Sequence, residues 1–225
     1  MTKVLIFDSG ALINLAMNGL LDILESLKKE FDGKFIMSRE VKYEVIDRPV
    51  GISRFELEAL RIQKLIDSKV IEFPSAVGIS DEILRKETER VMNIANHSVM
   101  SHGNWIKLVS EAEMSCIALS NKLEQAGTES MIAIDERTTR ILSERPANLE
   151  KIMADKMHRD IELNQETLKN FPKCRFIRSS ELVFVAYKKG LIDLEGKKVL
   201  EALLYATKFK GAAISFEEID ELKKL

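Results

Sequence analysis

The chain is poor in cysteine and has no long apolar run. Its two cysteines, Cys116 and Cys174, form no CxxC pair, and Cys116 lies in an apolar, helix-like stretch where a buried thiol is expected. No apolar run approaches the ~18 residues needed to cross a bilayer. The N-terminus begins with a strand-like run instead of a charged region followed by an apolar one, which argues against a secretory signal. These absences predict a protein of the reducing cytoplasm with no membrane partner.

The common nucleotide-binding and hydrolase motifs are also absent. The sequence contains no G-x-x-x-x-G-K-[ST], no G-x-G-x-x-G and no G-x-S-x-G. Its histidines, His97, His102 and His158, show no HExxH or other metal-ligand spacing, and we expect them on the surface or in a lid. The formal net charge is -2, so a nucleic-acid partner would have to bind a local basic patch.

The composition and the hydrophobic pattern predict one α/β domain over residues 1–225. With 45% hydrophobic and 31% charged residues, the chain resembles ordinary globular proteins that fold without disulfides. Strand-like runs occur at Val4–Phe7, Lys34–Met37, Met131–Ile134 and Cys174–Ile177. Helical spacing occurs between them, at Ala11–Leu27, Glu40–Ile46, Glu111–Leu123 and Lys197–Thr207. This alternation predicts a three-layer α/β/α fold with a mainly parallel central sheet.

Two charged segments interrupt this alternation. Residues 74–105 read as a charged helix followed by a polar loop, and residues 145–172 contain another charged helical piece. Neither has enough apolar residues for a core of its own, so both are predicted to be insertions in the sheet domain. The C-terminus reads as a helix, a turn at Gly211 and a short helix that Ser215 and Glu218 open with capping-box spacing.

Two aspartates follow predicted buried strands. Asp8 ends the run "VLIF", and Asp135 ends "MIAI", with Glu136 beside it. Each could simply cap the following helix. However, ligands of parallel α/β sheets bind beyond the carboxyl ends of the strands, so two acids in this position also indicate a site.

Three further acids lie at predicted helix starts. Glu44 shares a helical face with Glu40, and this like-charged pair repels unless a cation lies near. Glu113 forms the capping-box pattern S-x-x-E with Ser110, which is a sufficient structural explanation, and the helix dipole favours Glu111. The small residues at 112, 115 and 118 predict close packing of this helix, which would bring its N-terminus toward the same sheet edge.

Basic residues gather near the last predicted strand. They are Lys169, Lys173, Arg175, Arg178, Lys188 and Lys189. A solvated surface is the ordinary explanation, and a phosphate-binding rim around Lys173, Arg175 and Arg178 is the more specific one.

In their order along the chain, five short motifs resemble those of PIN-domain nucleases, in particular the archaeal and bacterial group related to the toxins of toxin–antitoxin pairs. They are "VLIFDSGALINLA", "SREVKYEVI", "SEAEMSCIALS", "IAIDERTTRIL" and "FIRSSELVFVAYKKGLI". The resemblance covers most of the chain except the two insertions. Ser110 stands where relatives often have glycine, and Glu136 where they often have a second aspartate.

The resemblance implies an acidic metal site. Its ligands would be Asp8, Glu44, Glu113 and Asp135, with Ser9 hydrogen-bonding near the metal. Glu111 and Glu136 are alternative ligands, because the tandem acids leave the register open. The resemblance also implies an RNA substrate, an antitoxin-like protein partner and homodimerisation.

The chemistry of clustered carboxylates agrees with this expectation. Such groups repel one another unless a divalent cation neutralises them, and Mg²⁺ or Mn²⁺ prefers oxygen ligands. A bound ion, or two ions ~3.5–4 Å apart, can activate water and stabilise phosphate charge. The predicted activity is therefore metal-dependent hydrolysis of phosphodiester bonds, most directly an endoribonuclease activity.

Other functions compete with this hypothesis. A phosphatase of the haloacid dehalogenase type would need a second aspartate two residues after Asp8, where this chain has Gly10. A receiver-like signalling domain would need paired acids near its start, and no acid precedes Asp8. A PIN-like scaffold that binds RNA or protein without cutting is the remaining alternative, and the charged insertions favour it.

Overall fold

Four parallel strands form the sheet that positions the candidate site. The computed structural model describes residues 3–225. The strands are β1 (Lys3–Phe7), β2 (Gly33–Ile36), β5 (Ser130–Ala133) and β7 (Phe176–Ile177), in the spatial order β2-β1-β5-β7. Each overlaps a predicted strand. The prediction of an α/β fold with a mainly parallel sheet is therefore confirmed.

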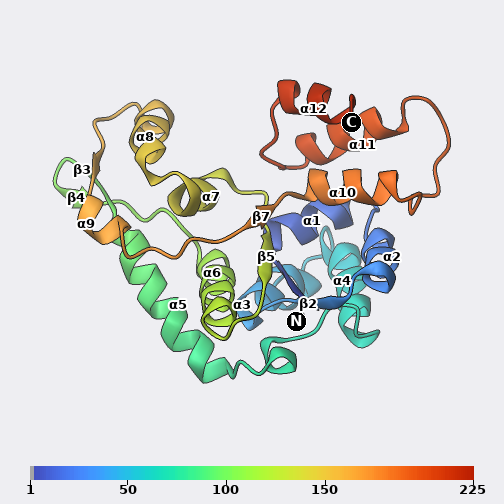
Figure 1. Cartoon of the computed structure of the whole chain (residues 1–225), viewed down its shortest axis with the longest axis horizontal. Coiled ribbons are helices and arrows are strands. Elements are labelled where there is room, and N and C mark those ends of the chain that lie inside the picture. Colours follow the sequence, from blue (N-terminus) through green and yellow to red (C-terminus); the bar gives the residue numbers. More distant parts are fainter. Residues whose placement is uncertain (1–2) are drawn as a thin grey trace.

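Helices lie on both sides of this sheet, with α6 on one side and α1 and α10 on the other (Figure 1). The α-helices are α1 (Ser9–Met17), α2 (Asp22–Glu30), α3 (Arg39–Lys42), α4 (Glu56–Asp67), α5 (Asp81–Asn96), α6 (Glu111–Gln125), α7 (Arg137–Glu144), α8 (Leu149–Met157), α9 (Gln165–Leu168), α10 (Ser179–Lys188), α11 (Val199–Phe209) and α12 (Phe216–Leu222). Shorter helical turns are η1 (Tyr43–Asp47), η2 (Pro49–Gly51), η3 (Pro74–Val77) and η4 (Pro146–Asn148).

Two predicted helices are interrupted. The continuous helix expected over Ala11–Leu27 is wrong, because α1 ends at Met17 and Gly19 adopts a left-handed φ of 69° before α2 begins. The helix expected over Glu40–Ile46 changes from α3 into the π-helix η1, which carries Glu44. Amphipathic periodicity cannot show such changes, because apolar residues keep roughly helical spacing through both.

The close packing predicted for α6 is present. Ala112, Ser115 and Ala118 are fully or almost fully buried. The Ser115 hydroxyl lies 2.6 Å from that of Ser38, at the start of α3, and the Cys116 thiol lies 3.6 Å from the carbonyl oxygen of Phe7. These contacts fix the first turns of α6 beside the end of β1.

The two predicted insertions pair with each other. Strands β3 (Val99–Ser101) and β4 (Asn104–Trp105) come from the first, and β6 (Glu162–Leu163) comes from the second. They form a small antiparallel sheet in the order β4-β3-β6. Apolar side chains of both segments, such as Val91 and Met153, belong to the main core, as expected for segments that lack a core of their own.

The C-terminal segment adds a small layer over α10. Gly211 has a φ of 120°, which allows the turn between α11 and α12. Ser215 and Glu218 form the predicted capping box of α12. Leu204, Ala212, Ile214 and Ile219 are buried together in a separate apolar cluster. The predicted helix, turn and short helix are therefore confirmed.

Within residues 3–225, none of the helices alone has the length and apolar character of a membrane span. Only α1 and α2 taken together reach that length and composition, and a bend of 118° separates them.

Gly33 provides a test of the β1–β2 pairing. A methyl group on its Cα would overlap the carbonyl oxygen of Lys3 and the ring of Phe31, whereas one on Gly51 would meet no atom within 4 Å. We expect Gly33→Ala to lower the free energy of unfolding by about 1–3 kcal/mol, the usual cost of overpacking. Urea unfolding should detect this loss. Equal stability of Gly33→Ala and the control Gly51→Ala would contradict the pairing.

Candidate metal centre

Asp8 lies at the end of β1 and is almost completely buried. Its backbone N–H donates to the carbonyl oxygen of Ala133 at 3.0 Å, which continues the pairing of β1 with β5. Its side chain caps α1 by accepting the N–H of Gly10 on Oδ2 at 3.0 Å. The other oxygen, Oδ1, is buried and has no hydrogen-bond partner within residues 3–225. Helix capping therefore accounts for Oδ2 of this carboxyl group but not for the buried Oδ1.

The surroundings of Asp8 disfavour its charged form. Burial, followed by the negative charge of Glu113 and, to a smaller extent, that of Glu44, raises the pKa of Asp8 from 3.8 to about 7. Backbone N–H groups of Gly10 and Ser9 act in the opposite direction. Asp8 is 2% exposed, so water gives little compensation. The structure therefore brings acids from β1, η1 and α6 within electrostatic range of one another.

Glu113 is at once a capping residue and a member of this cluster. Its Oε2 accepts the N–H of Ser110 and the hydroxyl of Thr139, both at 3.0 Å. The N–H of Glu113 in turn donates to the Ser110 hydroxyl at 3.2 Å, which completes the predicted capping box. Burial, together with the charges of Glu136 and Glu44, raises the pKa of Glu113. Both oxygen contacts use Oε2, so the second carboxylate oxygen is left for another partner.

Glu44 reaches the cluster from the π-helix η1. A π-turn is wider than an α-turn, and such turns are frequent at functional sites. Glu44 is half-buried, and its charge acts on both Asp8 and Glu113. The pattern of two glutamates four residues apart predicted a shared face for Glu40 and Glu44. The helix changes type between them, at Tyr43.

Glu136 lies at the edge of the cluster. It caps α7 by accepting the N–H of Thr139 on Oε2 at 2.7 Å, and its charge contributes to the raised pKa of Glu113. Thr139 thus links the two glutamates, because its N–H binds Glu136 while its hydroxyl binds Glu113. Glu111, the other alternative ligand, is exposed on the first turn of α6.

Asp135 is held by a hydrogen-bond network of its own. Oδ1 accepts the N–H of Ser179 at 2.8 Å, and Oδ2 accepts the Ser179 hydroxyl at 2.7 Å and the Asn14 amide at 2.9 Å. Burial raises the pKa of Asp135, although these hydrogen bonds and the charge of Arg140 oppose the effect. Asp8 and Asp135 flank Gly10, where an added Cβ would lie 3.3 Å from Oδ2 of Asp8 and 3.9 Å from Cβ of Asp135.

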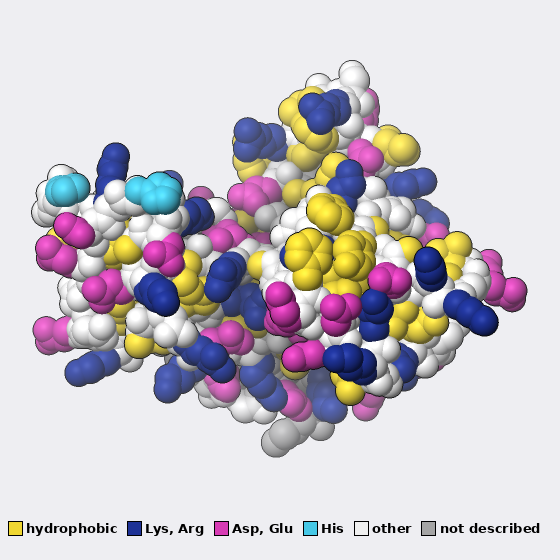
Figure 2. All heavy atoms as spheres, turned by 90° about the horizontal axis from the view of Figure 1, so that it is seen from above, with side chains coloured by type: hydrophobic (Ala, Val, Ile, Leu, Met, Phe, Trp, Pro, Cys, Tyr) yellow, Lys and Arg dark blue, Asp and Glu magenta, His cyan; other side chains and the backbone are white. Residues whose placement is uncertain are grey.

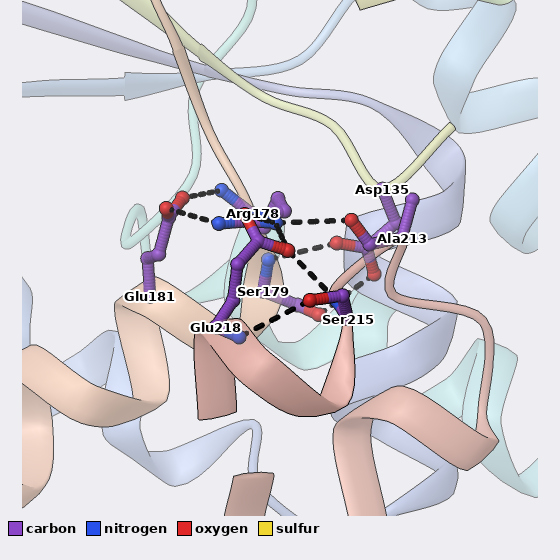
Figure 3. A network of polar contacts seen from close by, with 7 residues as sticks. All are labelled: Asp135, Arg178, Ser179, Glu181, Ala213, Ser215 and Glu218. Atoms are coloured by element: carbon purple, nitrogen blue, oxygen red, sulfur yellow. Dashed lines mark hydrogen bonds and ion pairs between the residues drawn. The ribbon is translucent and has the colours of Figure 1, made fainter. Parts of the chain in front are cut away.

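The network around Asp135 continues through Arg178 to the C-terminal helices (Figure 3). The Arg178 guanidinium is buried and donates to Glu181 at 2.8 Å, to Glu218 at 2.9 Å and to the carbonyl oxygen of Ala213 at 3.0 Å. The N–H of Ala213 donates to the carbonyl oxygen of Asp135 at 3.2 Å. These bonds join α10, the loop after α11 and α12 directly beneath the acidic site.

The predicted ligands are near one another but do not form a ready coordination shell. Among residues 3–225, no three His, Cys, Asp or Glu side chains are arranged to hold one metal ion. Carboxylate oxygens are the ligands that Mg²⁺ and Mn²⁺ prefer, and the unpartnered Oδ1 of Asp8 lies among them. The donor chemistry therefore fits such an ion, and the side chains would have to move to form a ligand set. The predicted supporting hydroxyl of Ser9 makes no side-chain hydrogen bond within the described residues.

The predicted basic rim is wrong as a single surface. Arg178 is buried and committed to Glu181 and Glu218. Arg175 forms an ion pair with Glu129 at 2.6 Å. Arg175 precedes β7 and Glu129 precedes β5, so the pair lies at the amino edge of the sheet. Lys173 is exposed and also precedes β7. Proximity in sequence placed the three together, but β7 separates Arg178 from Lys173 and Arg175.

Several residues that shape the site were not predicted. Asn14 is a completely buried amide inside an otherwise apolar helix, and that unusual position was an available signal. Ser179 follows β7 at the carboxyl edge, so the rule that selected Asp8 and Asp135 could also have selected it. No local pattern signals the contact between Thr139 and Glu113. The three histidines are exposed, as predicted, and the ring of His97 packs edge-to-face against that of Trp105, with 5.3 Å between the ring centroids.

No protein-family model, no curated protein and no solved structure matches this chain. The resemblance to PIN-domain nucleases thus rests on the order of its motifs, and the arrangement of the acids is an independent observation.

The raised pKa of Asp8 predicts a pH-dependent stability. Between pH 3.8 and about 7, the folded state keeps a proton that the unfolded state releases, so stability falls as the pH rises through this interval. The full pKa shift of Asp8 corresponds to a loss of at most about 4 kcal/mol in the free energy of unfolding. We expect Asp8→Asn to be more stable than the wild type at pH 8 without metal, and equally stable near pH 4. Urea unfolding in chelator at several pH values measures this difference. A constant difference across that range would contradict the buried, electrostatically coupled Asp8.

Proposed function

We propose that this chain is a PIN-like, metal-dependent nuclease with a three-layer α/β/α fold, and that it hydrolyses phosphodiester bonds in RNA. The observation that carries this proposal is the buried Asp8, whose Oδ1 has no partner among the described residues and whose pKa is raised by burial, Glu113 and Glu44. A divalent cation would offset the repulsion among these carboxylates. The motif order supports the same function.

In this proposal Asp8, Glu44 and Glu113 hold Mg²⁺ or Mn²⁺. Such an ion, when bound, supplies an activated water and neutralises charge on the phosphate. The chain positions its ligands through backbone contacts. The Gly10 N–H orients Asp8, and the Ser110 N–H with the Thr139 hydroxyl orients Glu113. In both residues one carboxylate oxygen is fixed by these hydrogen bonds, and the other makes no hydrogen bond among the described residues.

Asp135 and Glu136 have supporting positions in this proposal. Asp135 uses both oxygens to hold Ser179 and Asn14, which fixes the floor of the site. Glu136 acts electrostatically on Glu113 and stays an alternative ligand. The role of Asp135 as a direct ligand, the antitoxin-like partner and the homodimer stay predictions of the resemblance.

A non-catalytic scaffold that binds RNA or protein is the second candidate. Two observations favour it: no three acids within residues 3–225 form a ready metal site, and three hydrogen bonds already occupy the carboxylate of Asp135. Such a scaffold would bind RNA without cutting it. The two candidates therefore differ in one measurable property.

Cleavage of labelled single-stranded and hairpin RNA, with matching DNA beside it, tests the proposal. We expect cutting of RNA in Mn²⁺ or Mg²⁺ and none in chelator. Asp8→Asn should reduce the rate at least about 100-fold, because it removes a charged ligand from the proposed site. A folded wild-type protein that cuts nothing with either metal would favour the scaffold instead.

Glu113→Gln and Glu111→Gln form a matched pair on the first turn of α6. Both remove one negative charge, but only Glu113 is in the cluster, whereas Glu111 is exposed. We expect Glu113→Gln to lose cleavage and Glu111→Gln to keep it within about threefold, since the exposed side chain of Glu111 does not take part in the acidic cluster. Loss of cleavage in Glu111→Gln alone would show that Glu111, and not Glu113, is the ligand.

Metal binding should also be visible without any substrate. A ligand present at about 100 times its dissociation constant stabilises the folded state by about 2.7 kcal/mol, which for a chain of this size is about 5–10 °C in Tm. We expect Mn²⁺ at pH 7.5 to raise the Tm of the wild type in this way and to have little effect on Asp8→Asn. Equal shifts in both proteins would place the ion elsewhere.

A further inference from the structure

A cleft lined by basic side chains lies next to the acidic site. Its volume is about 860 Å³, and it lies between α7, η4 and α8 on one side and the α11–α12 segment on the other. Five basic and two acidic residues line it, although the whole chain has a net charge of -2. In Figure 2, Lys and Arg side chains lie in the hollow between the histidine-bearing part of the molecule and its larger part.

One of the two acidic residues that line this cleft, Glu218, is already paired, and the other, Glu144, is exposed at the end of α7. Glu218 accepts two hydrogen bonds from Arg178 and one from the N–H of Ser215. Three other cleft arginines have no such partner. Within residues 3–225, no carboxylate lies within 4.0 Å of Arg137, Arg140 or Arg145. Their charge is therefore available for an anionic ligand.

Arg140 connects the cleft with the acids. Its Nε is buried and lacks a hydrogen-bond partner among the described residues, which is a costly state for a guanidinium N–H. Its charge acts on Asp135. Ala213 and Arg178 both line the cleft. The N–H of Ala213 binds the carbonyl oxygen of Asp135, and Arg178 directly precedes Ser179, which binds the Asp135 carboxylate. An anion in the cleft would thus lie near Asp135, which borders the candidate metal centre.

The opposite wall carries an exposed aromatic ring. Phe209, at the end of α11, is 73% exposed and lines the cleft beside Lys208. Tyr205 packs at 6.2 Å from it, measured between ring centroids, and gives the ring a fixed support. Proteins that bind single strands combine a basic groove along the backbone with aromatic rings on which bases stack.

We propose that this cleft binds a single-stranded nucleic acid, with Arg137, Arg140 and Arg145 on its phosphates and Phe209 stacked on a base. The proposal rests on the proposed nuclease function for its substrate and names the surface that receives it. An adjoining hollow, lined by Glu136, Lys151 and Lys156, shares Arg137 with the cleft and extends its basic surface toward the acids. A duplex has its bases stacked internally, so it would lose the contact with Phe209.

Binding can be measured separately from cleavage in the full-length Asp8→Asn protein. The probe is a fluorescein-labelled 12-nucleotide RNA of mixed sequence, followed by anisotropy at several salt concentrations. We expect Arg137→Ala/Arg145→Ala to weaken binding at least tenfold and to reduce the salt slope by about 1.4, since each phosphate contact on a single strand contributes about 0.7. Phe209→Ala should weaken it at least fivefold, and Phe209→Tyr should restore it.

The control is Arg85→Ala/Lys86→Ala on the exposed face of α5, which removes the same charge. It should bind within twofold of the parent. Arg137 and Arg145 are exposed, so their removal should leave the fold intact, and thermal unfolding checks this. The proposal is overturned if the parent binds no single strand, if duplex RNA binds as tightly, or if cleft and control variants bind alike.

This outcome is distinguishable from failure of the proposed function. If the wild type cuts no nucleic acid but binding depends on the cleft, the cleft assignment stands and the nuclease proposal fails. If the wild type cuts RNA and the cleft variants keep its KM, the nuclease proposal stands and the cleft assignment fails.

Discussion

The burial of the Asp8 carboxyl group is the constraint on which the candidate site depends. Strand pairing with β5 and the start of α1 fix its backbone together, so the side chain cannot leave the edge of the sheet. There it has one satisfied and one unsatisfied oxygen, with Glu113 and Glu44 beside it. A protein keeps such a group only with a proton or a positive charge nearby. The raised pKa of Asp8 corresponds to the protonated carboxyl group, and a bound cation would supply the positive charge instead.

Helix capping and site formation are compatible in this fold. Glu113 and Glu136 both cap helices, and so does Asp8. A cap uses one carboxylate oxygen to bind a backbone N–H, which fixes the direction of the other oxygen. A capping role therefore orients these acids and is compatible with a role in a metal site. The same local geometry that made each residue ambiguous in the sequence now accounts for how the three are positioned.

The sequence was most informative where local chemistry decides the structure. Buried runs located the strands, and the acids that follow them led to the candidate site, because parallel strands share one carboxyl edge. It could not choose between Glu111 and Glu113, since that depends on helix rotation: residues two apart point about 200° apart, and only packing shows which faces the sheet. The bond between Arg178 and Glu218 joins residues 40 positions apart, and no local pattern encodes it. The change to a π-helix before Glu44 was equally invisible.

The connection from β5 to α7 carries two of the acids and two of the unpaired arginines. Asp135 and Glu136 follow β5 after Ile134, and α7 then begins with Arg137, with Arg140 three residues later on the same side of the helix. Electrostatic effects in salt extend only about 10 Å, so the net charge of the whole chain has little bearing on a phosphate in the cleft. In the proposed nuclease, a phosphodiester would have to approach carboxylates that repel it. Arginine charges on α7, one of which already acts on Asp135, would offset part of that repulsion, and a cation held by the carboxylates themselves would offset the rest.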